Sequence, residues 1–442
     1  MSRVLHRSNT VPAAALSGNG IWLRLDDGRE IIDGSGGAAV AVLGHGNARV
    51  VDAVARQAKN VAYIHSGFFT TDAAEGLADI LLNDQPGGLT HAYFCSSGSE
   101  GNEAALKLAR QYFVEIGQPG RAKFIGRRQG YQGNTLGALA AGGSLMRRAL
   151  YAPLLSDAFS LVSPCFPYRF RLEDESDGQY LDRLSAELEA EFQRLGPDTV
   201  IAFCCETMVG ATTGCVTAIP GYFRTVREIC DRHGALLILD EVMCGMGRTG
   251  TMHCWEHDGV PPDIQVVAKG LGGGYQPIGG ILIGGRIVAA LRQGSGAFMH
   301  GHTYQAHPVA CAAALEVQRI IAEEDLLANV RAMGAVLEQR LVERFANHRH
   351  VGEVRGRGLF WALEFVQDRA TKQAFDPALK LHDRVKQAAL DNGLGIYPMG
   401  GTIDGRQGDH VIVAPPYNVS ADEIDLIVNR LSVAVDTALA TV

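Results

Sequence analysis

The chain has 442 residues, 47% of them hydrophobic and 20% charged, so it carries enough apolar material for a large core. Its formal net charge of -8 gives no reason to expect nucleic acid or an anionic membrane as a partner. Its nine cysteines are irregularly spaced and form no C-x-x-C pair, which argues against a zinc site and indicates a reducing compartment.

The first ten residues lack the apolar core of a secretory signal peptide. No apolar run approaches the roughly 20 residues that a helix needs to span a bilayer. Together with the cysteines, these features predict a cytoplasmic protein that does not enter a membrane.

Residues 1–65 are predicted to form an N-terminal arm and a segment of a small domain. Short strands are expected at 21–25 and 30–33, because the turn Asp26-Asp27-Gly28 between them is a hairpin signal. A helical pattern of apolar residues begins after Gly44-His45-Gly46.

Residues 66–310 are predicted to form a large domain in which apolar strands and amphipathic helices alternate. Such an alternation predicts an α/β fold with a mostly parallel seven-stranded sheet and helices on both faces. We expect strands at 92–95, 123–125, 158–162, 199–205, 235–239, 263–268 and 278–283, and helices at 71–82, about 98–112, 182–195 and 221–233.

Residues 311–442 are predicted to form a smaller α+β domain. A long helix from 308 to about 345 is expected to join it to the large domain. A strand at 359–365, a helix at 377–392 and a last helix at 420–439 follow, with Asp376 as a cap before a first-turn proline.

Lys269 ends the apolar strand at 263–268 and is followed by a glycine-rich turn. Ligands of open α/β sheets bind where such strands end. Burial there lowers the pKa of a lysine and frees its amine to attack carbonyl carbon. For an isolated lysine, a solvated residue closing a strand is the more common explanation.

Asp240 and Glu241 follow the buried strand at 235–239. One of them could be a metal ligand, a general base or the counter-ion of a buried cation, and acids that simply end a strand are also common. The spacing from Asp240 to Lys269 leaves room for one excursion and the next strand, so both are expected at one edge of the sheet. A two-metal site would need more acids and histidines nearby, and we predict no metal.

Further motifs each admit two explanations. The serine-rich turn at 96–100 suits a phosphate at a helix start, or is an ordinary N-cap. Tyr131, between glycines, can stack on a planar ring or pack in a turn. Thr303 precedes a helix and suits a phosphate or a cap. The basic pair Arg147-Arg148 is predicted to be solvated surface. Together with Lys269 and an acid, these motifs fit a planar, phosphorylated aldehyde cofactor with a basic ring nitrogen.

Nearly the whole chain resembles the class III aminotransferases, pyridoxal-phosphate enzymes of fold type I that include ω-amino acid and amine:pyruvate transaminases. The resemblance rests above all on Leu239-Asp240-Glu241-Val242, Gly247-Arg248-Thr249-Gly250 and Ala268-Lys269-Gly270. It implies the fold-type-I architecture, pyridoxal 5'-phosphate as cofactor, and a homodimer or a tetramer as the active unit.

The resemblance also implies roles for individual residues. Lys269 would form the Schiff base and move the proton, and Asp240 would pair with the pyridinium nitrogen. Val242 and Tyr131 would pack on opposite ring faces. The remaining implied contacts are Ser97, Gly98 and Ser99 at the phosphate, Thr303 at the neighbouring subunit's phosphate, and Glu206 and Gln132 near the ring. Gln132 stands where the family usually has histidine, and Thr207 where it usually has proline.

Other positions bear on the substrate. Ala211 stands where members that use 4-aminobutyrate or ornithine carry a second glutamate, and Ile412-Val413 where they carry an arginine. Arg406 lies in a loop that resembles the mobile-arginine loop of amine:pyruvate transaminases. We hypothesise that it swings in to bind a keto-acid carboxylate, although an exposed loop arginine fits as well. The predicted pocket wall includes Ala39, His65 and Phe68.

These inferences predict a ping-pong transaminase that moves an amino group from an amine or ω-amino acid to a small 2-oxo acid such as pyruvate. The first alternative is another fold-type-I enzyme, either a dialkylglycine-type decarboxylase or an aminomutase or racemase. Tyr131 argues against the decarboxylase, which resembles this family but stacks a tryptophan. The second alternative, a non-catalytic binding module, is disfavoured by the intact Lys269.

Overall fold

The computed structural model describes residues 3–7, 11–440 and 442, and its centre is a seven-stranded sheet. Six strands run parallel to one another, and β12 runs antiparallel to its two neighbours. This confirms the predicted α/β fold. In sheet order the strands are β4 (Leu89–Cys95), β12 (Gly279–Gly284), β11 (Ile264–Ala268), β10 (Leu236–Asp240), β7 (Val200–Glu206), β5 (Lys123–Arg127) and β6 (Phe159–Val162).

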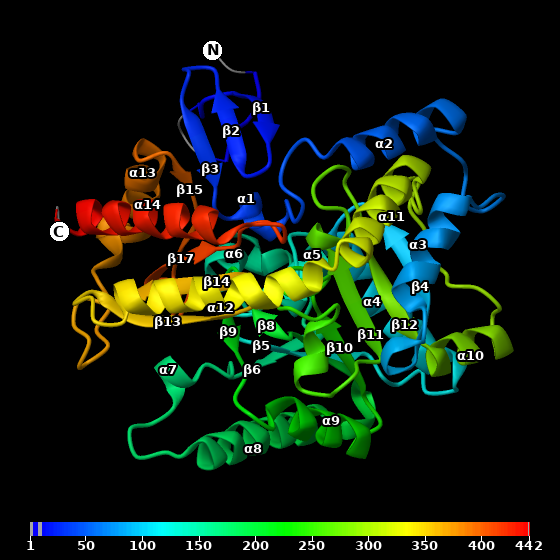
Figure 1. The fold of residues 1–442 in the computed structure, drawn as a ribbon. Helices are drawn as coiled ribbons and strands as arrows, with labels where there is room; N and C mark the ends of the chain where they lie inside the picture. The colour runs from blue at the N-terminus through cyan, green and yellow to red at the C-terminus, as the bar shows by residue number, and fades with distance from the viewer. Residues whose placement is uncertain (1–2, 8–10, 441) are drawn as a thin grey trace.

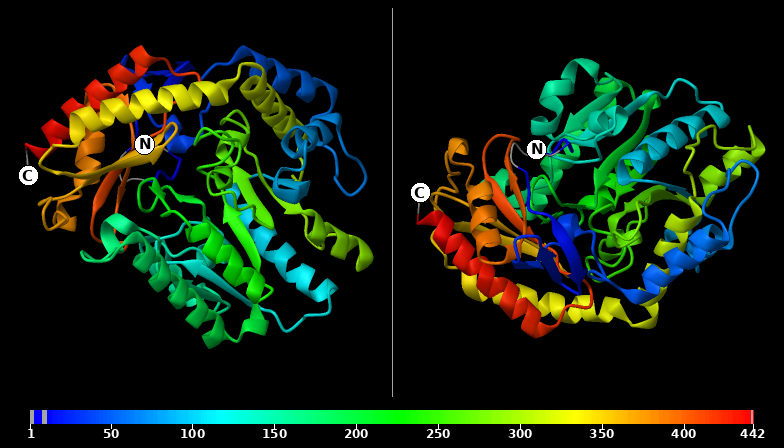
Figure 2. Two further views of the ribbon diagram at one scale, coloured as in Figure 1. Left: turned by 60° about the horizontal axis from the view of Figure 1, so that its bottom comes forward. Right: turned by 90° about the horizontal axis from the view of Figure 1, so that it is seen from above.

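Helices cover both faces of this sheet because its strands are apolar on both sides (Figures 1 and 2). In β10, Leu236 and Ile238 pack with residues of α4 (Gly98–Glu115) and α10 (Gly285–Gln293). The alternate residues Leu237 and Leu239 pack with α8 (Asp177–Leu195) and α9 (Tyr222–Arg232) on the other face. The period-two alternation of a strand therefore places consecutive residues in two different cores.

A second, antiparallel sheet is formed by the C-terminal part of the chain in the order β13 (Val351–Arg357), β14 (Phe360–Phe365), β17 (Asp409–Val413) and β16 (Tyr397–Gly400). A third sheet contains the N-terminal strands β1 (Ala15–Asn19), β2 (Trp22–Leu25) and β3 (Glu30–Asp33). Its fourth strand is β15 (Leu394–Gly395), which pairs with β3. The N-terminal strands thus lie beside the C-terminal part of the chain, as Figure 2 shows. The domain boundaries after residues 65 and 310 stay a prediction.

The remaining elements are further helices and a two-stranded sheet of β8 and β9. The larger helices are α2 (Ala48–Asn60), α3 (Asp72–Leu82), α11 (Pro308–Glu323), α12 (Leu326–Phe345), α13 (Leu381–Asp391) and α14 (Ala421–Leu439). The short elements are α1 (Gly36–Ala39), α5 (Leu136–Ala141), α6 (Leu145–Arg148), α7 (Pro167–Phe170), β8 (Met208–Val209) and β9 (Val216–Thr217).

Two helices that were predicted to be continuous are interrupted in the structure. The stretch from 308 to 345 is two helices, α11 and α12, which meet where Asp325 adopts a left-handed backbone with φ of 45°. The stretch at 377–392 is interrupted at Lys380, whose φ is 47°. Asp376 caps only the short 3-10 turn before this break, where its Oδ1 accepts the Ala378 N–H at 2.9 Å.

Candidate active site

A cavity of about 550 Å³ opens where β7, β10 and β11 end at their carboxyl termini. Ligands of open α/β sheets bind at this edge. The structure brings together nine of the predicted site residues, and these line the cavity: Ser97, Gly98, Ser99, Tyr131, Gln132, Glu206, Asp240, Val242 and Lys269. The lining also includes Arg7, Ala38, Val40, Arg147, Ala211, Met243 and Tyr397.

Lys269 follows directly on β11, and its backbone is left-handed, with φ of 47°. A left-handed backbone is uncommon for a residue with a side chain, and such strain concentrates at functional sites. Burial lowers the pKa of the Lys269 amine, and the carboxylates of Asp240 and Glu206 oppose this shift. A larger fraction of the amine is therefore uncharged near neutral pH, which is the form that acts as nucleophile or base.

Asp240 is the last residue of β10 and only 4% of it is exposed. Its Oδ2 accepts a hydrogen bond of 2.7 Å from Asn102 Nδ2, and its Oδ1 accepts one of 3.0 Å from the Val242 N–H. Burial raises the pKa of Asp240 to about 6, while these donors and Lys269 act in the opposite direction. Asp240 can therefore carry a negative charge at neutral pH and face a cationic group in the cavity.

Asn102 is a site residue that the sequence did not reveal. It lies in the second turn of α4, 4% exposed, and also donates to the Gly98 carbonyl at 3.1 Å. Nothing in a single sequence distinguishes it from any other helical asparagine. Its position four residues after Gly98, on the same face of the helix that starts at the cavity, is the feature that places Asn102 at the site.

Glu241 has a different task from its neighbour, which settles the choice between the two acids. It is fully buried and does not line the cavity. Its carboxylate accepts hydrogen bonds from Thr207 Oγ1 (2.8 Å), the Cys254 N–H (2.7 Å), the Trp255 N–H (2.7 Å) and Gln265 Nε2 (2.8 Å). Glu241 thus anchors the segment after β10 and is saturated with donors.

Glu206 ends β7 and pairs in register with Asp240 on β10. Its carboxylate accepts hydrogen bonds from the N–H groups of Tyr131 (2.9 Å) and Gly210 (3.1 Å). Burial, followed by the charge of Asp240, raises the pKa of Glu206 to about 7. Because it holds the backbone of Tyr131, Glu206 ties the loop after β5 to the sheet edge.

The start of α4 forms one wall of the cavity through Ser97, Gly98 and Ser99. Ser97 is the N-cap, and its Oγ accepts the Glu100 N–H at 3.2 Å. The first turn of a helix leaves N–H groups without intrahelical acceptors, and the helix dipole adds positive potential there. A Cβ on Gly98 would lie 2.8 Å from Cγ2 of Val242, so only glycine lets the two approach this closely.

Arg147 corrects a prediction, because its side chain lines the cavity and is not plain solvated surface. Its guanidinium carbon lies 4.8 Å from the centroid of the Tyr131 ring. Arg148 is not simply solvated either, since its guanidinium donates to the carbonyls of Leu139, Ala140 and Gly142. Arg148 therefore holds α6 against α5, and Arg147 on the same short helix is presented to the cavity.

Five predicted site residues lie outside the cavity of the chain. Ala39 is buried against Met243 and Cys244 in a neighbouring apolar cluster, and Ala38 and Val40 line the wall in its place. The other four are exposed: His65 and Phe68, which stack on each other, Thr303 before α11, and Arg406 at the tip of the loop at 401–408.

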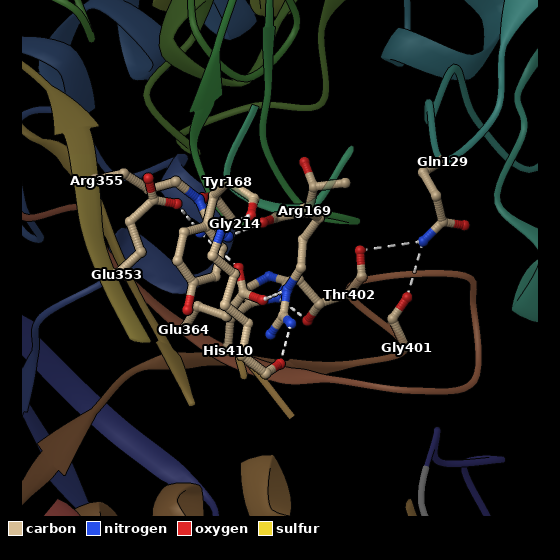
Figure 3. A network of polar contacts seen from close by, with 12 residues as sticks. Gln129, Tyr168, Arg169, Gly214, Glu353, Arg355, Glu364, Gly401, Thr402 and His410 are labelled. Carbon is tan, nitrogen blue, oxygen red and sulfur yellow. Dashed lines mark hydrogen bonds and ion pairs between the residues drawn. The ribbon is translucent and has the colours of Figure 1, made fainter. Parts of the chain in front are cut away.

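The loop at 401–408 is held at its base (Figure 3), and Arg406 at its tip is exposed. Gln129 Nε2 donates to the carbonyls of Gly401 (2.8 Å) and Thr402 (3.3 Å), and Thr402 Oγ1 lies 2.7 Å from His410 Nδ1. At the tip, the backbone N–H of Arg406 donates to Asp404 Oδ1 at 2.8 Å. This arrangement fixes where the loop starts and ends without burying Arg406.

A family model described as aminotransferase class-III matches residues 4–435 of the chain. The chain belongs to the class-III aminotransferases. An uncharacterised aminotransferase of Schizosaccharomyces pombe is 48% identical over 432 residues, which span 98% of this chain and 94% of the relative. A putrescine–pyruvate aminotransferase of Pseudomonas aeruginosa is 32% identical, over 96% of this chain and 90% of its own.

Solved structures agree with this assignment. An amine transaminase from an uncultivated Pseudomonas species, determined with pyridoxal phosphate bound, has a TM-score of 0.92 and 34% identity over 99% of each chain. This class-III aminotransferase is therefore a transaminase that uses pyridoxal phosphate, and the predicted family, fold type, enzyme class and cofactor are confirmed.

The residues of the cavity fit this cofactor. The start of α4, where Ser97, Gly98 and Ser99 line the cavity, favours an anionic group. Oε1 of Gln132, 3% exposed, has no hydrogen-bond partner among the described residues, so a ligand group can supply its donor. A buried amine and a buried carboxylate, Lys269 and Asp240, stand at the ends of adjacent strands.

Other kinds of site are not found in the described part of the chain. It contains no group of three or more histidine, cysteine, aspartate or glutamate side chains suited to hold a metal ion. Over the same residues, none of the helices of this aminotransferase is long and apolar enough to cross a membrane.

Proposed function

We propose that the enzyme moves an amino group from an amine or ω-amino acid to a small 2-oxo acid such as pyruvate, by a ping-pong mechanism. The observation that carries the choice of donor is Ala211, which is 4% exposed and lines the cavity. It stands where members that use 4-aminobutyrate or ornithine carry a second glutamate. A methyl group at this wall favours a donor with an apolar body.

In this proposal Lys269 bonds to the cofactor and Asp240 pairs with its ring nitrogen. Tyr131 and Val242 pack on the two faces of the ring, and Glu206 and Gln132 lie near its edge. The start of α4, with Ser97, Gly98 and Ser99, receives the phosphate. These assignments are supported by the lining of the cavity and by the hydrogen bonds of Asp240 and Glu206.

The cofactor supplies a carbonyl that takes up the amino group and a ring that withdraws electrons from the substrate. Lys269 would hold the cofactor and, with its amine free, would accept and return the proton at the reacting carbon of the substrate. Its lowered pKa suits this work, because a base is most effective near its own pKa. Asp240, held by Asn102, keeps the opposite end of the site negative.

The active unit that we propose is a homodimer in which Thr303 reaches the phosphate held by the neighbouring subunit. Thr303 is exposed and lies beside Tyr304, which is 58% exposed. We further propose that the Arg406 side chain swings toward the site when an oxo acid binds, since it is exposed at the tip of its loop. Nine free, buried cysteines support a cytoplasmic location.

A donor screen on the purified holoenzyme tests the function. Aliphatic and aromatic amines and ω-amino acids are added one at a time without an oxo acid, and the cofactor's absorbance and carbon dioxide release are followed. We expect apolar amines to convert the cofactor to its amino form without carbon dioxide. Release of carbon dioxide would indicate a dialkylglycine-type decarboxylase, and reaction only with an amino acid that is isomerised would indicate an aminomutase or racemase.

A further inference from the structure

Arg147 is a cation in the active-site cavity that has no anionic partner. No ion pair joins it to any residue that the structure describes, and its Nε is buried without a hydrogen-bond acceptor in that part of the chain. A buried donor that finds no acceptor costs free energy. A ligand that brings an acceptor to Arg147 would therefore be bound favourably.

The two acids of the cavity are already engaged. Asp240 accepts from Asn102 and from the Val242 N–H, and Glu206 accepts from the N–H groups of Tyr131 and Gly210. Neither carboxylate is hydrogen-bonded to Arg147. Burial lowers the pKa of the Lys269 amine, Asp240 and Glu206 oppose that shift, and the charge of Arg147 adds to it. The unpaired guanidinium thus faces the space where the substrate reacts.

The position of Arg147 is also fixed in advance. Its neighbour Arg148 donates to three carbonyls at the end of α5, which anchors α6. Gly405 packs on the same helix so closely that a Cβ there would lie 2.8 Å from Cβ of Leu145. The guanidinium itself lies against the Tyr131 ring. A planar, immobilised guanidinium matches a carboxylate through two parallel hydrogen bonds and loses little entropy on binding.

We propose that Arg147 binds the carboxylate of the 2-oxo acid substrate within the cavity, as a resident carboxylate-binding residue that does not have to move. This inference rests on the proposed function, which supplies the oxo acid. Arg7, which also lines the cavity, adds positive charge to it. An apolar amine donor has no carboxylate to offer, so with such a donor Arg147 distinguishes the two half-reactions. The proposed movement of Arg406 would add a second cation to one already in place.

The test uses holoenzyme and two unreactive probes of similar shape, propionate and its uncharged amide, propionamide. The variants are Arg147→Met, which keeps much of the side-chain length without the charge, and Arg194→Met on α8 as matched control. Arg194 is exposed, pairs with Glu191 on its own helix and Ser160 on β6, and does not line the cavity. Calorimetric titration should show propionate binding weakened roughly tenfold or more by Arg147→Met, with propionamide unchanged. Arg194→Met should change neither.

Arg147→Met should also raise KM for the oxo acid while leaving the half-reaction with an apolar amine within about twofold of wild type. The inference is overturned if Arg147→Met binds propionate like wild type, if Arg406→Met weakens it and Arg147→Met does not, or if Arg147→Met purifies without cofactor absorbance. Arg147-dependent propionate binding by an enzyme that transfers no amino group would leave this inference standing and refute the proposed function.

Discussion

Burial acts in opposite directions on the two central residues of the site. It lowers the pKa of the Lys269 amine and raises the pKa of the Asp240 carboxyl, because both shifts disfavour charge in a poorly solvated place. The proposed function nevertheless needs Asp240 charged. Asn102 reduces the conflict, since its amide donates to the charged form of Asp240.

Asn102→Ala removes that donor, so the pKa of Asp240 should rise above its present value of about 6. Below its pKa the carboxyl is protonated and cannot balance a cationic ring nitrogen. Cofactor binding to the Asn102→Ala apoenzyme should therefore weaken more at pH 6 than at pH 8 relative to wild type, by roughly fivefold at pH 6 for a pKa shift of one unit. Fluorescence titration with the cofactor at both pH values measures this. An equal loss at both would show that Asn102 acts only through packing.

At this scale the sequence revealed the residues whose place follows from a strand end or a helix start. Lys269 and Asp240 could be predicted because they directly follow apolar strands. Asn102 and Arg147 could not, because each acts across a gap between elements that only the folded chain closes. Ala39 was predicted in the cavity wall but does not line it. Its backbone is left-handed, with φ of 61°, and this turns the residues on either side of it in opposite directions.

At the scale of elements, a buried ionic cluster joins the small sheet to the loop after β8 (Figure 3). Arg355 on β13 pairs with Glu353 (2.6 Å) and with the fully buried Glu364 of β14 (2.5 Å), and it donates to the carbonyls of Thr213 and Gly214. These residues follow Ala211 of the cavity wall. The small sheet thus helps to position one side of the site.

Arg355→Met should destabilise the protein by about 3 kcal/mol, because it removes one partner of a buried ion pair and leaves Glu364 with Arg169 alone. Urea unfolding followed by circular dichroism measures the change. Arg355→Met combined with Glu364→Gln should recover part of the loss, since the charge left unpaired is then absent. A single variant within about 0.5 kcal/mol of wild type would mean that the cluster contributes nothing to stability.

The breaks between elements were the least predictable. Both wrong helices are interrupted by a charged residue in a left-handed backbone, Asp325 and Lys380, where glycine would have marked a turn. Of the small sheet, β14 was predicted at 359–365, whereas β13, β16 and β17 were not. Strand β13 contains two glycines and two arginines, so its pattern is not apolar, and its pairing with β14 holds it extended.

At the scale of the whole molecule, exposed apolar side chains gather on two segments, at 61–70 and 299–304. Phe68 is 76% exposed, Phe69 67%, and Met299 75%, and the rings of Tyr63 and Tyr304 lie 6.0 Å apart. Apolar surface of this kind marks an interface with another protein chain. In the proposed dimer it would face the second subunit, next to Thr303.

Phe68→Asp combined with Phe69→Asp should therefore convert the dimer to monomer at micromolar concentration and abolish activity, because burying unpaired charge at an interface is costly. Sedimentation velocity and cofactor content measure both effects. Leu172→Asp is the matched control, since Leu172 is 64% exposed on the segment after α7. A doubly substituted protein that stays dimeric and active would place the interface elsewhere.

The architecture as a whole was more predictable than its parts. Seven apolar strands separated by helices determine a buried, mostly parallel sheet, and the strand ends then determine where the site lies. The pairing of β15 with β3 could not be foreseen, since these segments are far apart in the chain and each is only a few residues long.

The most direct test of the proposed function follows the nitrogen itself. Holoenzyme is reacted with a 15N-labelled apolar amine, separated from it by gel filtration, and then given unlabelled pyruvate. We expect close to one 15N-alanine per active site, and none from Lys269→Ala, because the amino group must wait on the enzyme between the two substrates. Label that reaches alanine only when both substrates are present together, or that does not reach it at all, would contradict the account.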